Sequence, residues 1–569
     1  MNSSILLQIL PVLLLSAMIQ SCAEKPADVP SDVPAVEEVT ALEAQRLIIE
    51  ADLHRHTAVL AADEFEGRAP ATAGEELTVQ YLKQQFEALG LEPGNGEDWF
   101  QEVPVTSVTT APTAVLTIAG GEYRRELAYD AEMMAFTQQQ VELVTVENSP
   151  MVFVGYGINA PERGWNDYAG IDVTDKTVVM LVNDPGFATQ DETLFNGNTM
   201  TYYGRWDYKY EEAARQGATA AIIVHETAPA AYPWEVVTGS WSGPQIGITD
   251  ENKHLDKVEV EAWVTVDVAQ DLFAAAGLDY QTLKASAARP GFSAVPMGDL
   301  SASITLENTT ESSLSRNVVA RLPGTTHPDE HIIYSAHWDH LGRKPGVDGE
   351  DDIYNGAVDN ATGTAGLLAL ARLHMQQGAA QRSVLFLSVT AEESGLLGSK
   401  WYAENPIYPV ETTVANLNMD ALHEGGRMRD VAVVGYGNSE LESYLKIEAD
   451  AQDRVLVQEP NPEKGYYYRS DHFNFAKQGI PALYLTNSVD SREFGKAWGQ
   501  NQLDAYVSNN YHKPSDEYSE DWDLSGAAET IQLFYGVGSS LANSRDWPNW
   551  NAGVEFKVKR DETSAARAQ

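Results

Sequence analysis

The chain has 569 residues, of which 43% are hydrophobic, so it is long enough for two or three globular domains with sizeable cores. Its formal net charge of -45 at pH 7 argues against nucleic-acid binding, which needs a basic surface. The acidity fits a well-solvated surface, with an electrostatic preference for cationic substrates as the alternative.

The N-terminus combines a short apolar run, Ile5 to Ile19, with the single cysteine of the chain, Cys22. The run is too short to span a bilayer comfortably and lies where a secretory signal lies. Ile19-Gln20-Ser21-Cys22 resembles a bacterial lipoprotein processing site, although residues 1–4 contain no Lys or Arg. We expect a lipoprotein-type signal peptide over residues 1–22, with an ordinary signal peptide cleaved near Cys22 as the alternative.

This interpretation predicts an exported protein, periplasmic or at the cell surface, with a lipid anchor in the outer membrane through Cys22. Residues 23–39 are rich in Pro, Asp, Glu and Ala and are predicted to be a tether. With one cysteine, the chain can form no intrachain disulfide.

The first folded part is expected to cover residues 40–135. Helical patterns run over 41–60 and 75–89, and the second ends at Gly90, as helices often do. Short β-rich runs then alternate with turn residues, with one helix near 208–216 before a strand at 220–224. We interpret residues 136–298 as a β-rich inserted domain.

The pattern changes to strand, helix, strand, helix over residues 299–550, which predicts an α/β domain. Strands are expected at 318–320, 332–334 and 384–387, and a helix from Asp359 to about Met375. Ligand sites in such sheets lie at the carboxyl ends of the strands. The polar segment 551–569 is predicted to be a disordered tail.

Five short stretches of this domain offer two imidazoles, three metal-binding carboxylates and one further carboxylate: His337, Asp359, Glu392 and Glu393, Asp420, and His512. Zinc accepts nitrogen and oxygen ligands of this kind, and two metals that share a carboxylate can act together on water and a carbonyl. Asp339, two residues after His337, can fix an imidazole from behind. Taken alone, each residue has an ordinary explanation, such as a helix cap for Asp359.

The combination resembles the secreted bacterial dizinc aminopeptidases of the zinc-dependent exopeptidase fold. The resemblance implies a mixed β-sheet sandwiched by helices, with an inserted β-rich protease-associated domain. Besides the ligand motifs, the segments that carry the resemblance are 63–75 (DEFEGRAPATAGE), 155–158 (GYGI), 165–170 (WNDYAG), 203–206 (YGRW), 469–473 (RSDHF) and 479–482 (GIPA).

The resemblance also implies roles. His337, Asp359 and Asp420 would bind one Zn2+ ion, and Asp359, Glu393 and His512 a second, with Asp359 bridging. Glu392 would be the general base, and Asp339, which orients an imidazole, a further catalytic residue. Tyr468, Asp471 and His472 would line the substrate pocket, where Tyr468 or His472 could stabilise the oxyanion, with packing as the alternative role.

The expected function is a metallo-aminopeptidase that hydrolyses the N-terminal peptide bond of peptides with a free N-terminus, through a zinc-bound water and a glutamate base. One alternative is a glutaminyl cyclase, which would hold a single zinc. The other is a non-catalytic receptor-like ectodomain, which would have lost metal ligands.

Overall fold

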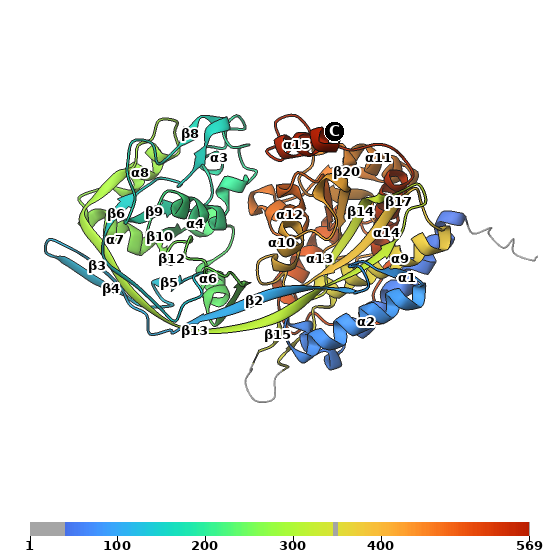
Figure 1. The fold of residues 1–569 in the computed structure, drawn as a ribbon. Helices are drawn as coiled ribbons and strands as arrows, with labels where there is room; N and C mark the ends of the chain where they lie inside the picture. The colour runs from blue at the N-terminus through green and yellow to red at the C-terminus, as the bar shows by residue number, and fades with distance from the viewer. Residues whose placement is uncertain (1–39, 345–350, 568–569) are drawn as a thin grey trace, which may run out of the picture.

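The computed structural model describes residues 40–344 and 351–567, which form two lobes joined by two long strands (Figure 1). The expected signal peptide, Cys22 and the tether at 23–39 lie outside the described residues. Within the described ranges, no helix has the length and apolar character needed to cross a membrane.

One lobe is built on a mixed sheet. Its strands in spatial order are β11 (Pro244–Ile248), β2 (Phe100–Thr110), β13 (Val295–Leu322), β17 (Arg382–Val389), β14 (His327–His337), β18 (Thr413–Asn418), β21 (Ala482–Thr486), β19 (Asp430–Val433) and β20 (Val455–Gln458), with β1 (Glu92–Pro93) paired to the end of β13. The four central strands β17, β14, β18 and β21 are parallel to one another. At one end of this group β13 runs antiparallel to β17, and at the other end β19 runs antiparallel to β21.

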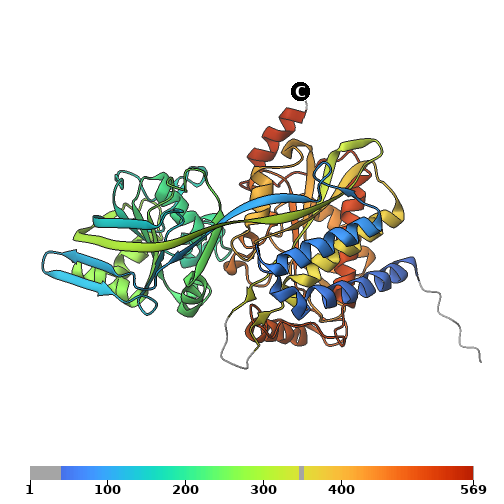
Figure 2. The same cartoon turned by 60° about the horizontal axis from the view of Figure 1, so that its bottom comes forward.

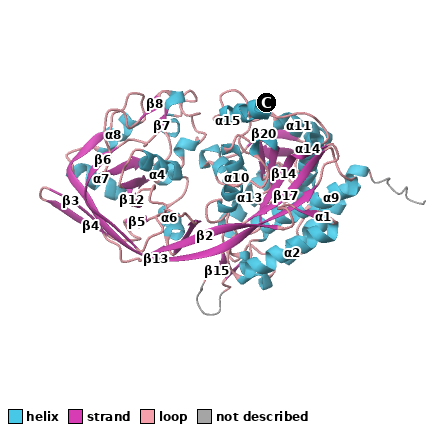
Figure 3. Cartoon of the chain, viewed as in Figure 1, coloured by secondary structure: helices cyan, strands magenta, loops and turns pink. Residues whose placement is uncertain are grey.

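Helices cover both faces of this sheet, as Figure 3 shows. Alternate residues of β17 point to opposite faces, so Val384 and Phe386 belong to one apolar core and Leu385 and Leu387 to another. The first core is formed with α1 (Ala41–Leu60), α2 (Ala73–Leu89), α9 (Gly363–Gln377), α11 (Leu441–Ala451) and α14 (Ser525–Ala542). The second is formed with α10 (Leu397–Glu404) and α12 (His472–Lys477). The expected fold class, a mixed sheet between helices, is confirmed.

The second lobe has its own sheet and core. Its strands in spatial order are β4 (Tyr123–Leu127), β3 (Leu116–Gly120), β13, β6 (Leu143–Phe153), β9 (Thr177–Leu181), β10 (Ala220–His225), β12 (Val260–Thr265) and β5 (Met133–Phe136). Its helices are α3 (Pro185–Thr189), α4 (Trp206–Arg215), α5 (Thr227–Ala230), α6 (Trp234–Trp241), α7 (Val266–Ala275) and α8 (Tyr280–Ala287). Two short antiparallel pairs complete the described strands: β7 (Asn159–Ala160) with β8 (Trp165–Asn166) in the second lobe, and β15 (Gly342–Arg343) with β16 (Ile353–Tyr354) against residues 63–68 of the first lobe.

Strand β13 belongs to both sheets, which Figure 2 shows from a second direction. Its residues 295–307 pair with β6, and residues 308–318 pair with β2. The apolar core of the second lobe accordingly includes residues from Ala114 to Leu306. The expected limits of the insert, 136 and 298, were therefore too narrow. Because one continuous strand serves both lobes, the composition does not change at the boundary.

Two other expectations need correction. Residues 557–567 form helix α15 (Lys557–Arg567), so the prediction of a disordered tail is wrong there. The buried side chains of Phe556 and Arg560 explain the order, since the Arg560 guanidinium donates to the carbonyls of Thr413 and Val414. The helix expected from Asp359 begins at Gly363, after an irregular turn at 357–362.

Candidate metal centre

The six residues singled out as ligands and base meet at the carboxyl ends of three adjacent parallel strands. His337 ends β14, the Glu392–Glu393 pair follows β17, and Asp420 follows β18. Asp359 lies in the turn before α9, and His512 follows α13 (Lys496–Asn509). We call these six residues the site cluster. Parallel strands have their carboxyl ends at the same edge of a sheet, which explains why motifs at the ends of β14, β17 and β18 meet.

Asp359 lies between the two imidazoles of the site cluster. Its Oδ1 is 3.4 Å from Nε2 of His337, and its Oδ2 is 3.2 Å from Nε2 of His512. On the first side, Asp420 Oδ1 is 3.2 Å from His337 Nε2. On the second, Glu393 Oε2 is 3.1 Å from His512 Nε2. Each oxygen of Asp359 therefore faces a different imidazole and a different second carboxylate.

These separations fit zinc. Two ligand atoms that each lie about 2.1 Å from a tetrahedral ion are about 3.4 Å from each other, and the four distances are 3.1–3.4 Å. The Nε2 atom of His512 is buried and has no hydrogen-bond partner of good geometry in the described chain. The donor set of imidazole nitrogens and carboxylate oxygens is that of a zinc site, and a cation would satisfy it.

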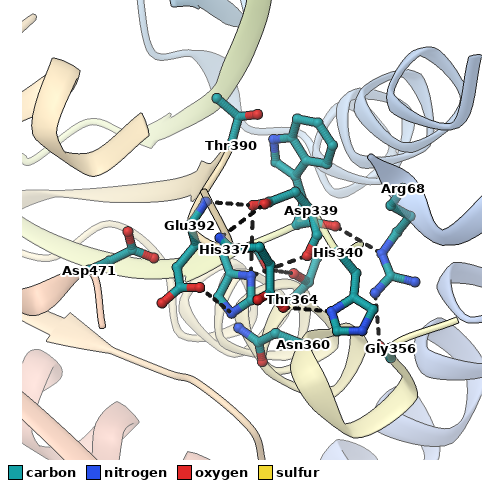
Figure 4. A network of polar contacts seen from close by, with 12 residues as sticks. Arg68, His337, Asp339, His340, Gly356, Asn360, Thr364, Thr390, Glu392 and Asp471 are labelled. Atoms are coloured by element: carbon teal, nitrogen blue, oxygen red, sulfur yellow. Dashed lines mark hydrogen bonds and ion pairs between the residues drawn. The ribbon is translucent and has the colours of Figure 1, made fainter. Parts of the chain in front are cut away.

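Asp339 lies behind the cluster and is fully buried. Its Oδ1 accepts the backbone N–H of Glu392 at 3.0 Å (Figure 4). Its Oδ2 accepts the backbone N–H of Glu393 at 3.3 Å. Its Oδ1 is also 3.7 Å from Nδ1 of His337, whose Nδ1 lies 3.2 Å from the Asp339 carbonyl. One residue thus orients both glutamates and one imidazole.

The electrostatics of the cluster separate the adjacent glutamates. Burial raises the pKa of the Glu392 carboxyl well above its ordinary value. Burial acts in the same direction on Glu393, but the imidazoles of His512 and His340 outweigh it and lower the pKa to about 2. A bound cation would lower the pKa of any carboxyl that it contacts. Glu393 is thus held as an anion, whereas Glu392 has the higher proton affinity.

The expected pocket residues do not all face the cluster. Asp471 does: Figure 4 shows it beside Glu392, and its Oδ1 accepts a 2.5 Å hydrogen bond from Ser399. His472 is fully buried between the rings of Tyr467 and Tyr484, with centroid distances of 4.7 and 4.9 Å. Neither of its nitrogens has a hydrogen-bond partner in the described chain.

Tyr468 points toward the other lobe. Its ring packs against Phe473 and against Tyr202 of the second lobe, at 5.2 and 6.1 Å. These contacts favour the packing role for Tyr468 and His472 over a role in the substrate pocket. Tyr511 lies beside the cluster: its ring stacks on that of His512 at 3.9 Å, and burial is the chief cause that raises its pKa.

Sequence reasoning missed two further residues at the centre. His340 is buried, and its Nδ1 lies 2.6 Å from Oε1 of Glu393. Asp516 is buried, and its Oδ2 accepts the backbone N–H of Asp359 at 3.1 Å. His340 could have been suspected from the sequence because it directly follows Asp339. Tyr511 could have been suspected in the same way, because it directly precedes His512. The peptide bond between Asp359 and Asn360 is cis.

The second lobe touches the loop that borders the cluster. The Met200 N–H donates to the Pro462 carbonyl at 3.1 Å, and the ring of Tyr202 lies 5.5 Å from that of Phe473. The same loop carries Ser470, whose hydroxyl donates to Oδ2 of Asp420 at 2.6 Å. The second lobe thus packs against a segment that donates a hydrogen bond to Asp420, one of the candidate ligands.

Residues 317–535 match the family model described as Peptidase family M28. This range contains every member of the site cluster, and it ends within α14.

Three curated relatives illustrate the similarity in sequence. The chain is 33% identical over 141 residues to the mouse protein named Aminopeptidase NAALADL1, covering 23% of this chain and 17% of the relative. It is 34% identical over 105 residues to a probable zinc metalloprotease of Pyrenophora teres f. teres, covering 18% and 22%. It is 26% identical over 237 residues to Leucine aminopeptidase 2 of Arthroderma otae, covering 39% and 44%. The chain thus spans less than half the length of each of these relatives.

Among solved structures, the chain resembles an aminopeptidase from Aneurinibacillus sp. strain AM-1, with a TM-score of 0.49, 20% identity, and coverage of 88% of this chain and 97% of that one. It also resembles BSAP, a zinc aminopeptidase from Bacillus subtilis, with a TM-score of 0.41, 15% identity, and coverage of 90% and 98%.

Proposed function

We propose that the protein is a zinc-dependent aminopeptidase that hydrolyses the N-terminal peptide bond of peptides through two zinc ions. The observation that carries the proposal is the position of Asp359, whose two carboxylate oxygens face different imidazoles at 3.4 and 3.2 Å. His337, Asp359 and Asp420 would hold one ion, and Asp359, Glu393 and His512 the other. The match of residues 317–535 to Peptidase family M28 supports the reaction class.

Zinc, when bound, supplies Lewis acidity to a water molecule and to the carbonyl of the scissile bond. Glu392 removes a proton from that water and delivers it to the leaving amine. Its placement supports this role: Oε2 is 3.9 Å from His337 Nε2, and the backbone N–H is held by Asp339. Burial raises the pKa of Glu392, which brings its proton affinity nearer to that needed at neutral pH.

The residues around the cluster would position the substrate. Asp471 lies beside Glu392, and its Oδ2 has no hydrogen-bond partner in the described chain. We propose that this carboxylate attracts the free α-ammonium group of the peptide, which restricts cleavage to the N-terminus. Tyr511, beside the cluster, replaces Tyr468 and His472 as the candidate donor to the carbonyl oxygen.

The alternative functions have less support. A glutaminyl cyclase would need one metal position, whereas the cluster offers a second set of ligands around His512. A receptor-like ectodomain would be expected to lack ligands, whereas all six residues meet. No observation favours either alternative over the peptidase.

One assay tests the proposal. Aminoacyl chromogenic substrates, and matching substrates with an acetylated N-terminus, are incubated with the protein before and after chelation, and bound zinc is counted. We expect release of the free amino acid only from the unblocked substrates, loss of activity on chelation, and about two zincs per chain. Conversion of N-terminal glutamine to pyroglutamate with one zinc would support the cyclase, and no turnover at full zinc occupancy would support the receptor.

We further propose that the second lobe is a protease-associated domain of a secreted bacterial enzyme, and that Cys22 carries a lipid anchor. The segments 155–158, 165–170 and 203–206 of that lobe and the lone cysteine after an apolar run support this. In a host that processes lipoproteins, Cys22→Ser should move the protein from the membrane fraction to the soluble exported fraction. An unmodified mature N-terminus downstream of Cys22 would show an ordinary signal peptide.

A further inference from the structure

The turn that carries Asp359 is irregular, although the Ala361 N–H donates to the Gly356 carbonyl within it at 3.1 Å. Asp359 has φ −109° and ψ 93°, and Asn360 has φ −135° and ψ 42°, so neither has helical geometry. The N–H groups at the start of this turn therefore need acceptors from elsewhere, because buried donors without partners are costly. All of the turn from Ala357 to Thr362 is buried.

Asp516 supplies these acceptors to three consecutive residues. Its carbonyl accepts the N–H of Ala357 at 3.0 Å. Its Oδ1 accepts the N–H of Val358 at 3.0 Å, and its Oδ2 accepts that of Asp359 at 3.1 Å. The side chain is 1% exposed, so water does not compete for these hydrogen bonds. Both carboxylate oxygens are used on the backbone of the turn.

Asp516 is also tied to the segment that carries His512. It lies four residues after His512, and its own N–H donates to the carbonyl of Lys513 at 3.1 Å. The hydroxyl of Tyr506, from the last part of α13, donates to Asp516 Oδ2 at 3.3 Å. One residue therefore connects the turn of Asp359 to the loop of His512, two segments more than 150 positions apart in the sequence.

We propose that Asp516 is a positioning residue that sets the distance between Asp359 and His512, and thereby the affinity of the second metal position. The inference rests on the proposed zinc function. It concerns the 3.2 Å separation of Asp359 Oδ2 and His512 Nε2, which an ion between them requires. Asp516 itself contacts the backbone of the turn, not the ion.

Asp516→Asn is the direct test. The asparagine keeps the shape but directs an NH2 group at one of the two N–H donors, so one of the hydrogen bonds is lost. Partners behind metal ligands typically change metal affinity by about 10- to 100-fold. We expect the second zinc to require at least about 10-fold more free zinc for half occupancy, while the first is bound as in the wild type. The readout is bound zinc per chain after equilibrium dialysis at buffered free-zinc concentrations, together with Tm.

Asp430→Asn is the matched control. Asp430 is a buried aspartate on β19 that also accepts two consecutive backbone N–H groups, from Val489 at 3.3 Å and Asp490 at 3.0 Å. Its variant should lower Tm without changing the zinc titration. If both variants shift the zinc titration equally, the effect is general destabilisation and the inference is wrong.

A second variant covers the case in which Asp516→Asn does not fold. Tyr506→Phe removes one hydrogen bond to Asp516 and keeps the packing, so we expect about a threefold higher zinc requirement at the second position. Zinc binding identical to the wild type in every folded variant of Asp516 and Tyr506 would overturn the inference. If the wild type itself binds no zinc, the proposed function fails first, and the two failures are thus distinguished.

Discussion

Asp339 and Glu392 are joined by a 3.0 Å hydrogen bond from the Glu392 backbone N–H to Asp339 Oδ1. The same carboxylate accepts the N–H of Glu393, so a single buried side chain fixes the peptide units of both glutamates. Consecutive side chains project in different directions, and fixing the backbone therefore fixes which glutamate faces which part of the cluster.

Asp339→Asn should disturb this arrangement while keeping the side-chain shape. Its NH2 group would oppose one of the two N–H donors, and we expect kcat/KM to fall by about 10- to 100-fold. Steady-state kinetics and zinc analysis check this. Asp430→Asn is the control, because Asp430 is a buried aspartate away from the cluster that also accepts two backbone N–H groups. Wild-type kinetics in Asp339→Asn would show that the contact has no role in catalysis.

The two glutamates should respond differently to the same substitution. Glu392→Gln removes the proposed base and should lower kcat by on the order of 10²- to 10⁴-fold, with both zincs retained and KM little changed. Glu393→Gln removes a proposed ligand and should weaken one zinc, with partial recovery on added zinc. Each variant controls for the other. If Glu392→Gln loses metal while Glu393→Gln keeps it and is slow, the roles are reversed.

The sequence predicted that the proposed ligands and base would meet where they lie at the ends of strands. His337 ends β14 and Glu392 follows β17, so the positions of these side chains depend on the sheet, which the alternation of strands and helices indicated. Asp359 was expected to begin a helix, but its turn is held by Asp516, a residue 157 positions away. Such long-range acceptors leave no local pattern in the sequence.

Side-chain direction in irregular segments could not be predicted. Tyr468 lies in a single 3-10 turn, Tyr466–Tyr468, and His472 begins the short helix α12. In such segments a rotation of one residue decides whether a side chain faces the site or the core. The outcome depended on the aromatic residues of the second lobe, such as Tyr202, whose position was not predictable before the lobes were placed.

The contact between the lobes should matter for activity. Tyr202→Ala removes ring contacts to Tyr468 and Phe473, at 6.1 and 5.5 Å, which lie on either side of Ser470. Aromatic pairs contribute about 0.5–1.5 kcal/mol each, so we expect kcat/KM to fall about 3- to 10-fold and hydrogen exchange over residues 462–473 to accelerate. Tyr280→Ala, at a buried tyrosine elsewhere in the second lobe, serves as the control. Equal effects of the two substitutions would contradict a specific role of the contact.

His472 provides a test of the corrected pocket. Because the imidazole is fully buried without a hydrogen-bond partner in the described chain, we expect His472→Leu to retain kcat/KM within a few-fold. Burial lowers the pKa of His472 from 6.5 to about 3. Between these two pH values the unfolded chain binds a proton at His472 that the folded chain does not bind. The free energy of unfolding is therefore unaffected by this group above pH 6.5 and decreases as the pH falls from 6.5 toward 3.

The leucine variant lacks this titration. Between pH 7 and pH 5, its free energy of unfolding should fall by about 2 kcal/mol less than that of the wild type, measured by urea unfolding at both values. His327→Leu, at a partly exposed histidine, controls for the loss of an imidazole outside the buried core. A loss of activity greater than tenfold at unchanged zinc content would return His472 to the substrate pocket. If the wild type and His472→Leu show the same pH dependence of the free energy of unfolding, the His472 imidazole takes up a proton in the folded state. Its surroundings between the rings of Tyr467 and Tyr484 oppose that protonation.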